Sequence, residues 1–411
     1  MEHTTLFYII ITILLIDAIW GWVLAELNRR SWAEYVPTRL SDVYPQEKFE
    51  KQKQYRKANH RFGKISSTFN LVVLLVFLWF HGFAFVDEMV LQISDHWLLR
   101  PLLFFGIIGL ASFIIGLPFS VYETFVIEER FGFNTTTPKT FVLDQIKGLL
   151  LGALIGGGLL ALIVWFYEAA GEWFWLYAWA GLTVFMIFFS KFYTTLILPL
   201  FNKQTPLEEG ELRTAIEKMS QKAGFNLENV YVMDGSRRST KANAFFSGFG
   251  KNKRIVLFDT LIKELDTDEI VGVLAHEIGH FKLKHIIRGT VLSVLQTGIM
   301  LFLLGWFVEH PALARALGAE EVSFHIGLIG FGMLYSPVSS FLGLGMTILS
   351  RRHEYQADAF AARHASPGAL QSALKKISAN ALSNPTPHPW FVFFNYSHPP
   401  LLKRLEVLDE F

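Results

Sequence analysis

Long apolar runs separated by charged segments dominate the pattern of this chain. Each run is about as long as the roughly 20 residues that a helix needs to cross a lipid bilayer. We therefore predict a mainly α-helical integral membrane protein with about seven transmembrane helices. The expected spans lie at residues 4–25, 66–86, 102–122, 148–167, 173–198, 290–308 and 325–349.

The charged residues between these runs are distributed unevenly. Lys and Arg crowd the first, third and fifth connecting segments and the tail after the last run, whereas the other connecting segments hold very few. Because cytoplasmic loops carry an excess of Lys and Arg, we expect the N-terminus outside and the C-terminus in the cytoplasm. The first connecting segment, 26–65, is expected to be a basic solvated loop.

Two stretches of the chain have the composition of a soluble domain. In the first, Thr205 followed by Pro206 is a typical helix start, and Gly224 is a typical helix stop. Further elements are expected at 230–233 (a strand), 243–250 with 254–258 (a hairpin), and 351–364 (a helix).

The segment 266–280 is predicted to be a helix that carries candidate metal ligands. Asp266 and Glu269 have the spacing of a capping box. His276 and His280 lie four residues apart, so both imidazoles share one helix face and can reach one ion. Zinc prefers nitrogen ligands of this kind, and Glu277 is placed to take a proton from zinc-bound water, as in H-E-x-x-H metalloproteases.

The patterns together divide the chain into a membrane domain and a small cytoplasmic α+β domain of the zincin type. The expected segments are 1–201 (membrane domain, five spans), 202–289 (protease domain with the motif helix), 290–349 (two spans) and 350–411 (the rest of the protease domain).

Composition narrows the possible partners. The 411 residues carry a formal net charge of +1, which argues against a nucleic-acid partner. The chain contains no cysteine, which excludes disulfide partners and thiol catalysis. The remaining expected partners are the lipid bilayer, a peptide or protein substrate, and one Zn²⁺ per chain.

Several motifs together resemble the Ste24 CAAX prenyl protease family, which are integral-membrane zinc peptidases of the M48 group. The resemblance covers essentially the whole chain, and it implies that the membrane helices enclose a large chamber. Because the sequence shows no terminal Lys-Asp-Glu-Leu-type address, a prokaryotic member is expected. It rests on 122–134, Asn243-Ala-Phe-Phe, His276-Glu-Ile-Gly-His280, Glu354-Tyr-Gln-Ala-Asp358 and Ser397-His-Pro-Pro-Leu-Leu-Lys-Arg404.

The resemblance implies a role for each residue that matches a family motif. The implied roles are zinc ligation (His276, His280, Glu354), general base (Glu277), orientation of a ligand histidine (Asp358), oxyanion stabilisation (His398), and substrate binding (Asn243, Arg404). A helix-capping role remains the alternative for His398, and a turn residue before a strand is the alternative for Asn243.

The third zinc ligand has competitors in the sequence. His285 is out of register for a metzincin site, and on a continuous helix it points away from the face that His276 and His280 share. His353 and Glu354 are adjacent, so they point about 100° apart on a helix, and only one can face the metal. Glu354 shares its face with Asp358, which agrees with the family pattern.

We therefore expect a zinc metalloendopeptidase of the CAAX prenyl protease type. A general membrane-protein quality-control protease without prenyl specificity is the main alternative, because bacteria generally lack protein prenylation. A polytopic transporter with an incidental H-E-x-x-H is disfavoured by the soluble block at 202–287. The expected location is the bacterial inner membrane, or the endoplasmic reticulum membrane in a eukaryote.

Overall fold

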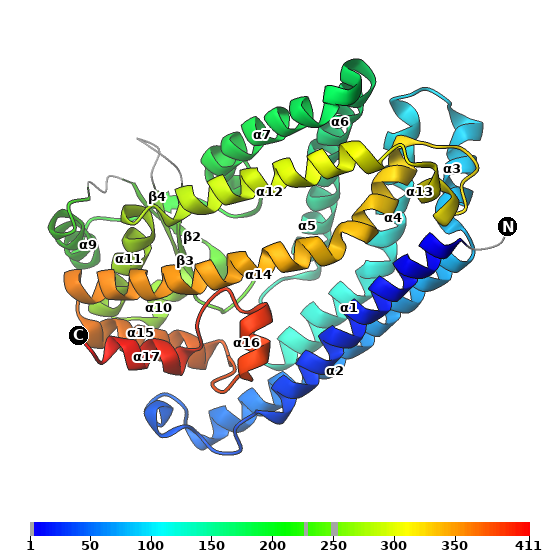
Figure 1. Cartoon of the computed structure of the whole chain (residues 1–411). Coiled ribbons are helices and arrows are strands. Elements are labelled where there is room, and N and C mark those ends of the chain that lie inside the picture. Colours follow the sequence, from blue (N-terminus) through cyan, green and yellow to red (C-terminus); the bar gives the residue numbers. More distant parts are fainter. Residues whose placement is uncertain (1–3, 226–228, 248–253) are drawn as a thin grey trace.

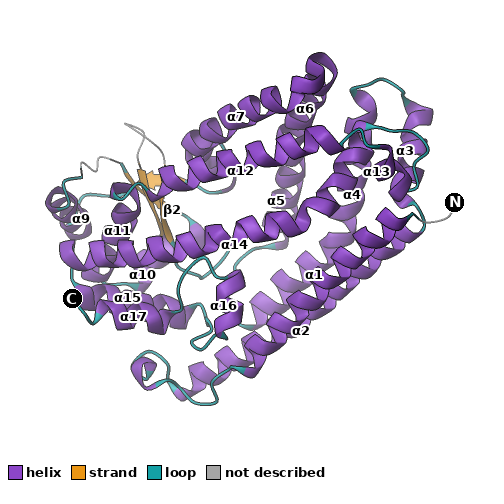
Figure 2. Cartoon of the chain, viewed as in Figure 1, coloured by secondary structure: helices purple, strands orange, loops and turns teal. Residues whose placement is uncertain are grey.

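The computed structural model describes residues 4–225, 229–247 and 254–411. Long helices make up one end of the molecule, and a small sheet with shorter helices makes up the other (Figures 1 and 2). The C-terminus lies at the sheet-bearing end, whereas the N-terminal helix begins at the opposite end (Figure 1).

The long helices supply the candidate membrane spans. Within the described residues, six helical stretches are long and apolar enough to cross a membrane. One of them, Pro138–Phe201, has 64 residues and bends back at Gly171, whose φ of +53° suits glycine. The count of seven spans stays a prediction. The helices that make up the six stretches are α1 Thr5–Arg30, α2 Gln46–Trp79, α4 Leu99–Tyr122, α5 Pro138–Leu151, α6 Gly157–Ala170, α7 Phe174–Leu196, α8 Leu198–Phe201, α12 His285–Phe307 and α14 Phe324–His364.

These helices form a closed ring. Around it, contacts run from α1 to α2, through α3 (Gly82–Ile93) to α4, then to α6, α7, α12 and α14, and from α14 back to α1. Short helical segments adjoin these helices: the π-helices η2 Glu123–Glu128 and η3 Gly152–Gly156, the 3-10 turn η4 Gly171–Trp173, and α13 Pro311–Ala316. The 3-10 turn η1 Thr38–Leu40 connects α1 and α2, and its Leu40 packs with Leu405 at the sheet-bearing end.

The first basic segment is not the solvated loop that the sequence predicted. Helix α1 continues to Arg30, and α2 begins at Gln46. Lys, Arg, Glu and Gln are good helix formers. In addition, residues in the polar half of α2 are buried against the C-terminal part of the chain. Phe49, which is 1% exposed, packs in a cluster with Leu405.

The sheet-bearing end combines segments from both soluble stretches. Its four strands are β1 Gln204–Pro206, β2 Val230–Met233, β3 Ala244–Ser247 and β4 Arg254–Phe258, in the order β1-β2-β4-β3. Strands β2 and β4 are parallel, and the other pairs are antiparallel. The turn expected between β3 and β4 lies outside the described residues. The helices of the sheet-bearing end are α9 Glu211–Lys222, η5 Gly235–Arg237, α10 Asp259–Glu264, α11 Thr267–Lys282, α15 Pro367–Asn380, α16 Pro389–Asn395 and α17 Leu401–Leu408.

The helix predicted to start at Thr205 begins later than expected. Residues 204–206 instead pair with β2 as an edge strand, where the missing N–H of Pro206 is tolerated. Helix α9 starts at Glu211 after Gly210, and it ends before Gly224 as the sequence predicted. Long-range strand pairing therefore overrides the local helix-start signal.

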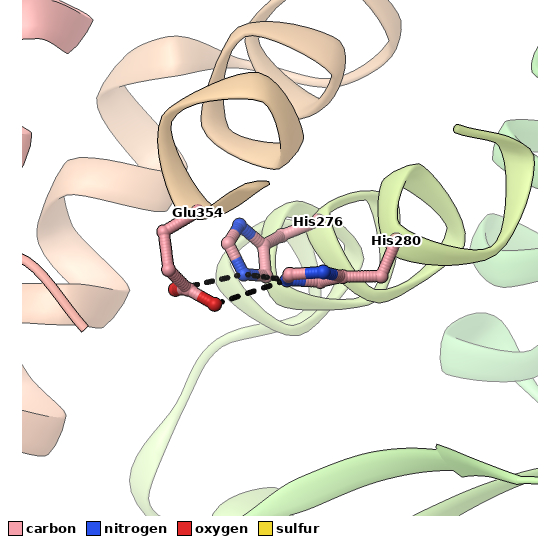
Figure 3. Close-up of side chains that lie close together, drawn as sticks. All are labelled: His276, His280 and Glu354. Atoms are coloured by element: carbon pink, nitrogen blue, oxygen red, sulfur yellow. Dashed lines mark hydrogen bonds and ion pairs between the residues drawn. The ribbon is translucent and has the colours of Figure 1, made fainter. Parts of the chain in front are cut away.

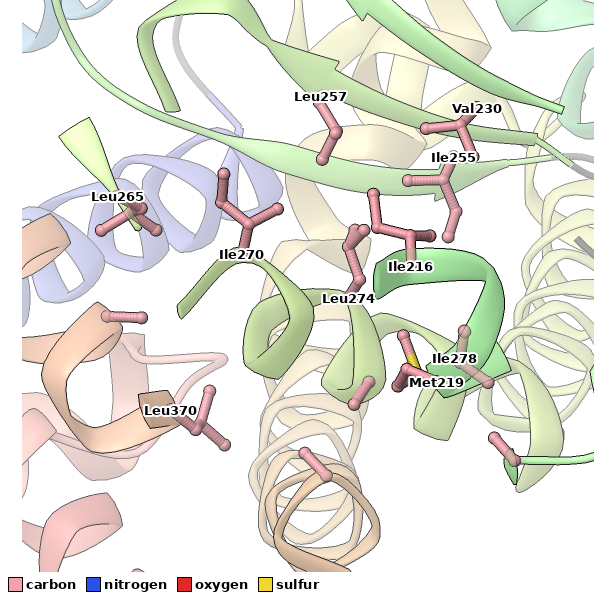
Figure 4. Packing of buried hydrophobic residues seen from close by; sticks show 14 of the residues in the cluster. Ile216, Met219, Val230, Ile255, Leu257, Leu265, Ile270, Leu274, Ile278 and Leu370 are labelled. Atoms are coloured by element: carbon pink, nitrogen blue, oxygen red, sulfur yellow. The ribbon is translucent and has the colours of Figure 1, made fainter. Parts of the chain in front are cut away.

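The motif helix α11 lies in the middle of the core of this end. Its capping box, formed by Asp266 and Glu269, is present as predicted. Ile270, Leu274 and Ile278 are at most 2% exposed. They pack with residues of α9, β2 and β4 (Figure 4). The apolar face of α11 is therefore held between the sheet and the neighbouring helices.

The opposite side of α11 approaches α14 very closely at Gly279. A Cβ at this position would lie 3.2 Å from the Cα of Ala357 and 3.2 Å from the Cβ of Phe360. Such distances leave no room for a larger side chain. Gly279 thus sets the spacing between two helices that both continue toward the functional site.

We predict that Gly279→Leu separates α11 from α14, lowers the melting temperature, and weakens metal binding. Overpacking of this kind costs about 1–3 kcal/mol. Gly289→Leu in α12 is the matched control, because a Cβ there would meet nothing within 4 Å. Thermal unfolding and metal titration of both detergent-solubilised variants provide the measurement. Equal behaviour of the two variants would contradict the close-approach argument.

Candidate metal centre

Three buried or half-buried side chains from two helices converge on one point. His276 and His280 come from α11, and Glu354 comes from α14 (Figure 3). The two imidazole Nε2 atoms are 3.1 Å apart, and the Glu354 carboxylate lies 3.5 Å from Nε2 of His276 and 3.2 Å from Nε2 of His280. All three ligand atoms lie within 4.8 Å of one another.

This donor set suits a divalent metal ion. Two imidazole nitrogens and one carboxylate are the three protein ligands of a class of catalytic zinc sites. The surroundings also favour positive charge at this point. Burial disfavours a charged imidazole, but the hydrogen bonds with Asp358 and Glu354 outweigh it and raise the pKa of His276 to about 9. The residues present therefore fit a bound cation.

Asp358 orients His276 from behind. Its Oδ1 lies 2.9 Å from Nδ1 of His276, which leaves Nε2 facing the centre. Arg404 of α17 holds Asp358 through two hydrogen bonds of 2.8 and 2.6 Å. Asp358 is 0% exposed, and a buried carboxylate needs such partners. The C-terminal helix thereby supports the centre.

His285 orients His280 in a way that the sequence did not indicate. The sequence argument assumed a continuous helix, but α11 ends at Lys282, and Lys284 has a φ of +60°. His285 therefore bends back, and its Nδ1 lies 3.1 Å from Nδ1 of His280. Nε2 of His285 is 2.9 Å from Oε1 of Gln356.

His353 faces away from the centre, toward His285. The two rings stack with centroids 3.9 Å apart. Neither His285 nor His353 belongs to the cluster of candidate ligands found in the described residues. A break in the helix between His280 and His285 is the one signal that could have revealed the role of His285. A non-glycine left-handed residue such as Lys284 is difficult to anticipate from sequence.

Glu277 follows His276 on α11, and the charged groups of the centre influence the pKa of its carboxyl. Desolvation raises the pKa of the Glu277 carboxyl, and the nearby charge of Glu354 acts in the same direction, whereas His276 and His280 oppose it. A raised pKa brings a carboxylate nearer to the value that suits a general base at neutral pH.

Two of the remaining predicted residues reach the centre, and one does not. His398, whose side chain is 65% exposed, has Nδ1 2.8 Å from Oε2 of Glu354. Nη1 of Arg404 lies 3.6 Å from the same oxygen. Asn243 precedes the edge strand β3 and is exposed, and its Oδ1 accepts a hydrogen bond from the Ala244 N–H at 2.8 Å. Among the described residues, no hydrogen bond joins Asn243 to the candidate ligands.

The fold and the centre together define a membrane-embedded metallopeptidase. Residues 27–203 match the family described as CAAX prenyl protease N-terminal, five membrane helices, and residues 206–411 match peptidase family M48. The chain belongs to this family, as the resemblance of its motifs predicted.

Relatives match along almost the whole chain. The identity is 36% to a CAAX prenyl protease 1 homolog of Oryza sativa subsp. japonica, over 91% of this chain and 90% of the relative. The identity to CAAX prenyl protease 1 of Saccharomyces cerevisiae is 34%, and the match covers 95% of this chain and 94% of the relative. The crystal structure of S. mikatae Ste24p superposes with a TM-score of 0.93 at 33% identity, covering 99% of this chain and all of that chain. The protein is therefore an integral-membrane metalloprotease.

The geometry predicts which substitutions empty the metal centre. Glu354→Ala should lose most of the bound metal, because it removes the carboxylate ligand. Asp358→Ala and His285→Ala should each lower metal affinity by roughly 10–100-fold, since they release the ligand histidines. His353→Ala is the control and should keep the metal. Metal content and competition with a chelator give the measurement, and a metal-free His353→Ala beside a loaded Glu354→Ala would contradict the assignment.

Proposed function

We propose that this protein is a zinc endopeptidase in which Glu277 is the general base and His276, His280 and Glu354 hold the ion. The observation that carries the proposal is the convergence of these three side chains on one point in a chain that belongs to peptidase family M48. Glu277 adjoins His276 in the chain, and the charges of the same three groups influence the pKa of its carboxyl. A bound zinc ion would polarise the substrate carbonyl and lower the pKa of a water molecule.

The chain's own residues would carry out the remaining tasks of the reaction. Glu277 accepts a proton from the attacking water and passes it to the leaving amine. Asp358 and His285 hold the ligand imidazoles with their Nε2 atoms toward the centre. His398, beside Glu354 and largely exposed, is placed to donate a hydrogen bond to the oxyanion.

Strand β3 is the proposed docking edge for the substrate. It is the last strand in the sheet order, so within the described part of the chain one of its edges has no partner strand. It also contacts the motif helix α11. An extended peptide can bind such an edge through main-chain hydrogen bonds. Asn243, at the start of this strand, would set the position of the peptide, and Arg404 would bind substrate only indirectly, since its guanidinium is engaged by Asp358.

The proposed substrate is a peptide or protein with a prenylated C-terminus. The relatives that match more than nine tenths of the chain are named CAAX prenyl proteases, and their names supply this substrate class. Cleavage of unmodified peptides, as in membrane-protein quality control, is the second candidate.

A paired peptide assay tests both the chemistry and the substrate. We expect the metal-loaded protein to cleave a farnesylated C-a-a-X peptide faster than the same peptide without the farnesyl group. Glu277→Gln should keep the metal and lose about 10²–10⁴-fold or more in turnover of both peptides, with Asp268→Asn on the exposed side of α11 as control. Equal cleavage of both peptides would favour the second candidate, and an active Glu277→Gln would refute the proposed mechanism.

The proposed orientation places the metal centre and the C-terminus in the cytoplasm and the N-terminus outside, in a bacterial inner membrane or a eukaryotic endoplasmic reticulum membrane. The distribution of Lys and Arg supports it. Because the chain has no cysteine, single substitutions give unambiguous labels. Glu172→Cys should react with a membrane-impermeant maleimide from outside, and Glu410→Cys only after the membrane is opened. Labelling of both sites from one side would contradict the orientation.

A further inference from the structure

A cavity away from the metal centre lies between α2 and the end of α4. Its volume is about 500 Å³, and its lining is mainly apolar and aromatic, with Phe62 and Ile65 on one side and Phe119 and Tyr122 on the other. The rings of Phe62 and Tyr122 stack with centroids 5.6 Å apart. Two arginines, Arg61 of α2 and Arg130 just beyond η2, are the charged residues of the lining.

Both arginines are exposed and have no acidic partner among the described residues. No ion pair within 4 Å joins either guanidinium to a carboxylate in that part of the chain, although many other arginines of the protein are paired. Arg130 lies over the ring of its neighbour Phe131, at 5.6 Å. The cavity therefore offers two uncompensated positive charges beside an apolar surface.

The cavity opens on the outer side of α2. Gln52 of this helix is buried and donates a hydrogen bond to the Ser383 carbonyl of the protease end, at 2.9 Å. Arg61 follows nine residues later, which places it on the opposite helix face. Further along α2, toward its C-terminal end, the face of Arg61 carries exposed apolar residues: Ile65 at 64%, Val72 at 51% and Trp79 at 51%. In a membrane-spanning helix, such an apolar exposed face contacts lipid.

The arginines also lie at the level where the membrane begins. Residues 65–86 and 101–122 contain no Asp, Glu, Lys or Arg, so charges stop at Lys64 on α2 and resume at Glu123 after α4. Arg61 and Arg130 are thus just outside the apolar parts of two neighbouring spans. This end of α2 is also the end that contacts the protease domain, through Phe49 and Leu405.

We propose that this cavity binds an anionic phospholipid from the leaflet at the metal end. The guanidinium groups of Arg61 and Arg130 bind the phosphate, and the aromatic cavity receives the adjoining part of an acyl chain. Basic pockets between spans at the cytoplasmic side bind anionic headgroups by this combination. An uncharged prenyl group would leave both arginines without a partner, and the face of Arg61 points away from the protease domain.

The site is connected to the substrate edge through its inner wall. Phe131 lines the cavity and is 4% exposed, in a cluster with Tyr55. Tyr55 and Lys241 both bond Glu128 of η2, with Lys241 Nζ 2.7 Å from Oε2. Lys241 lies two residues before Asn243. A lipid that fills the cavity would therefore pack against the segment around Glu128, and this segment binds Lys241 just before β3.

The test measures phospholipid binding to the purified full-length protein. Native mass spectrometry and thermal unfolding are compared with phosphatidylglycerol, phosphatidylcholine and inorganic phosphate. We expect retention and thermal stabilisation with phosphatidylglycerol alone, and at least about tenfold weaker binding for Arg61→Gln/Arg130→Gln, since each charge-assisted bond is strong. The matched control is Lys57→Gln/Lys64→Gln, which removes two exposed charges of α2 that do not line the cavity.

Each alternative has a distinct outcome. Equal retention of phosphatidylcholine, or unchanged binding in the arginine variant, would overturn the proposal. Competition by inorganic phosphate at the same concentration as the lipid would indicate a free-anion site. Displacement of phosphatidylglycerol by a farnesylated peptide would identify the cavity as a substrate surface instead. Because none of these readouts needs peptide cleavage, they stand apart from the test of the protease activity.

Discussion

The close packing of α11 against α14 is the constraint on which the rest of the structure depends. Gly279 lets the two backbones approach, and this approach brings Glu354 within 3.5 Å of the imidazoles of His276 and His280. Burying these charged groups would cost several kcal/mol for each ion without partners. Asp358 and Arg404 supply partners from α14 and α17, so the C-terminal helix is as necessary to the centre as the motif helix itself.

The same packing couples the protease domain to the membrane ring. Helix α14 is continuous from Phe324 to His364, so a single helix is both a candidate span and the carrier of Glu354. A second connection runs through the segment after α4. Asp144 pairs with Arg238 through bonds of 2.7 and 2.9 Å, and Glu128 pairs with Lys241. These ion pairs attach the residues that precede β3 to the membrane helices.

Both candidate ligand histidines are oriented, but by different means. His276 relies on the charged pair of Asp358 and Arg404, whereas His280 relies on the neutral chain of His285 and Gln356. A carboxylate raises the basicity of its ligand histidine more than a neutral acceptor does. The two imidazoles therefore differ in donor strength although they share one helix face.

Local patterns in the sequence determined the apolar spans, the motif helix with its capping box and strand β2, because each depends on periodicity or on a short motif. They also placed His276 and His280 on one helix face, whereas the choice of Glu354 as their companion used helix geometry together with the family resemblance. Contacts between distant segments decided the rest. Pairing with β2 turned residues 204–206 into a strand, and packing on Leu405 ordered the start of α2. The left-handed Lys284 placed His285 behind His280. None of these has a local signature, since each arises from a partner far along the chain or from a backbone conformation that only the folded structure stabilises.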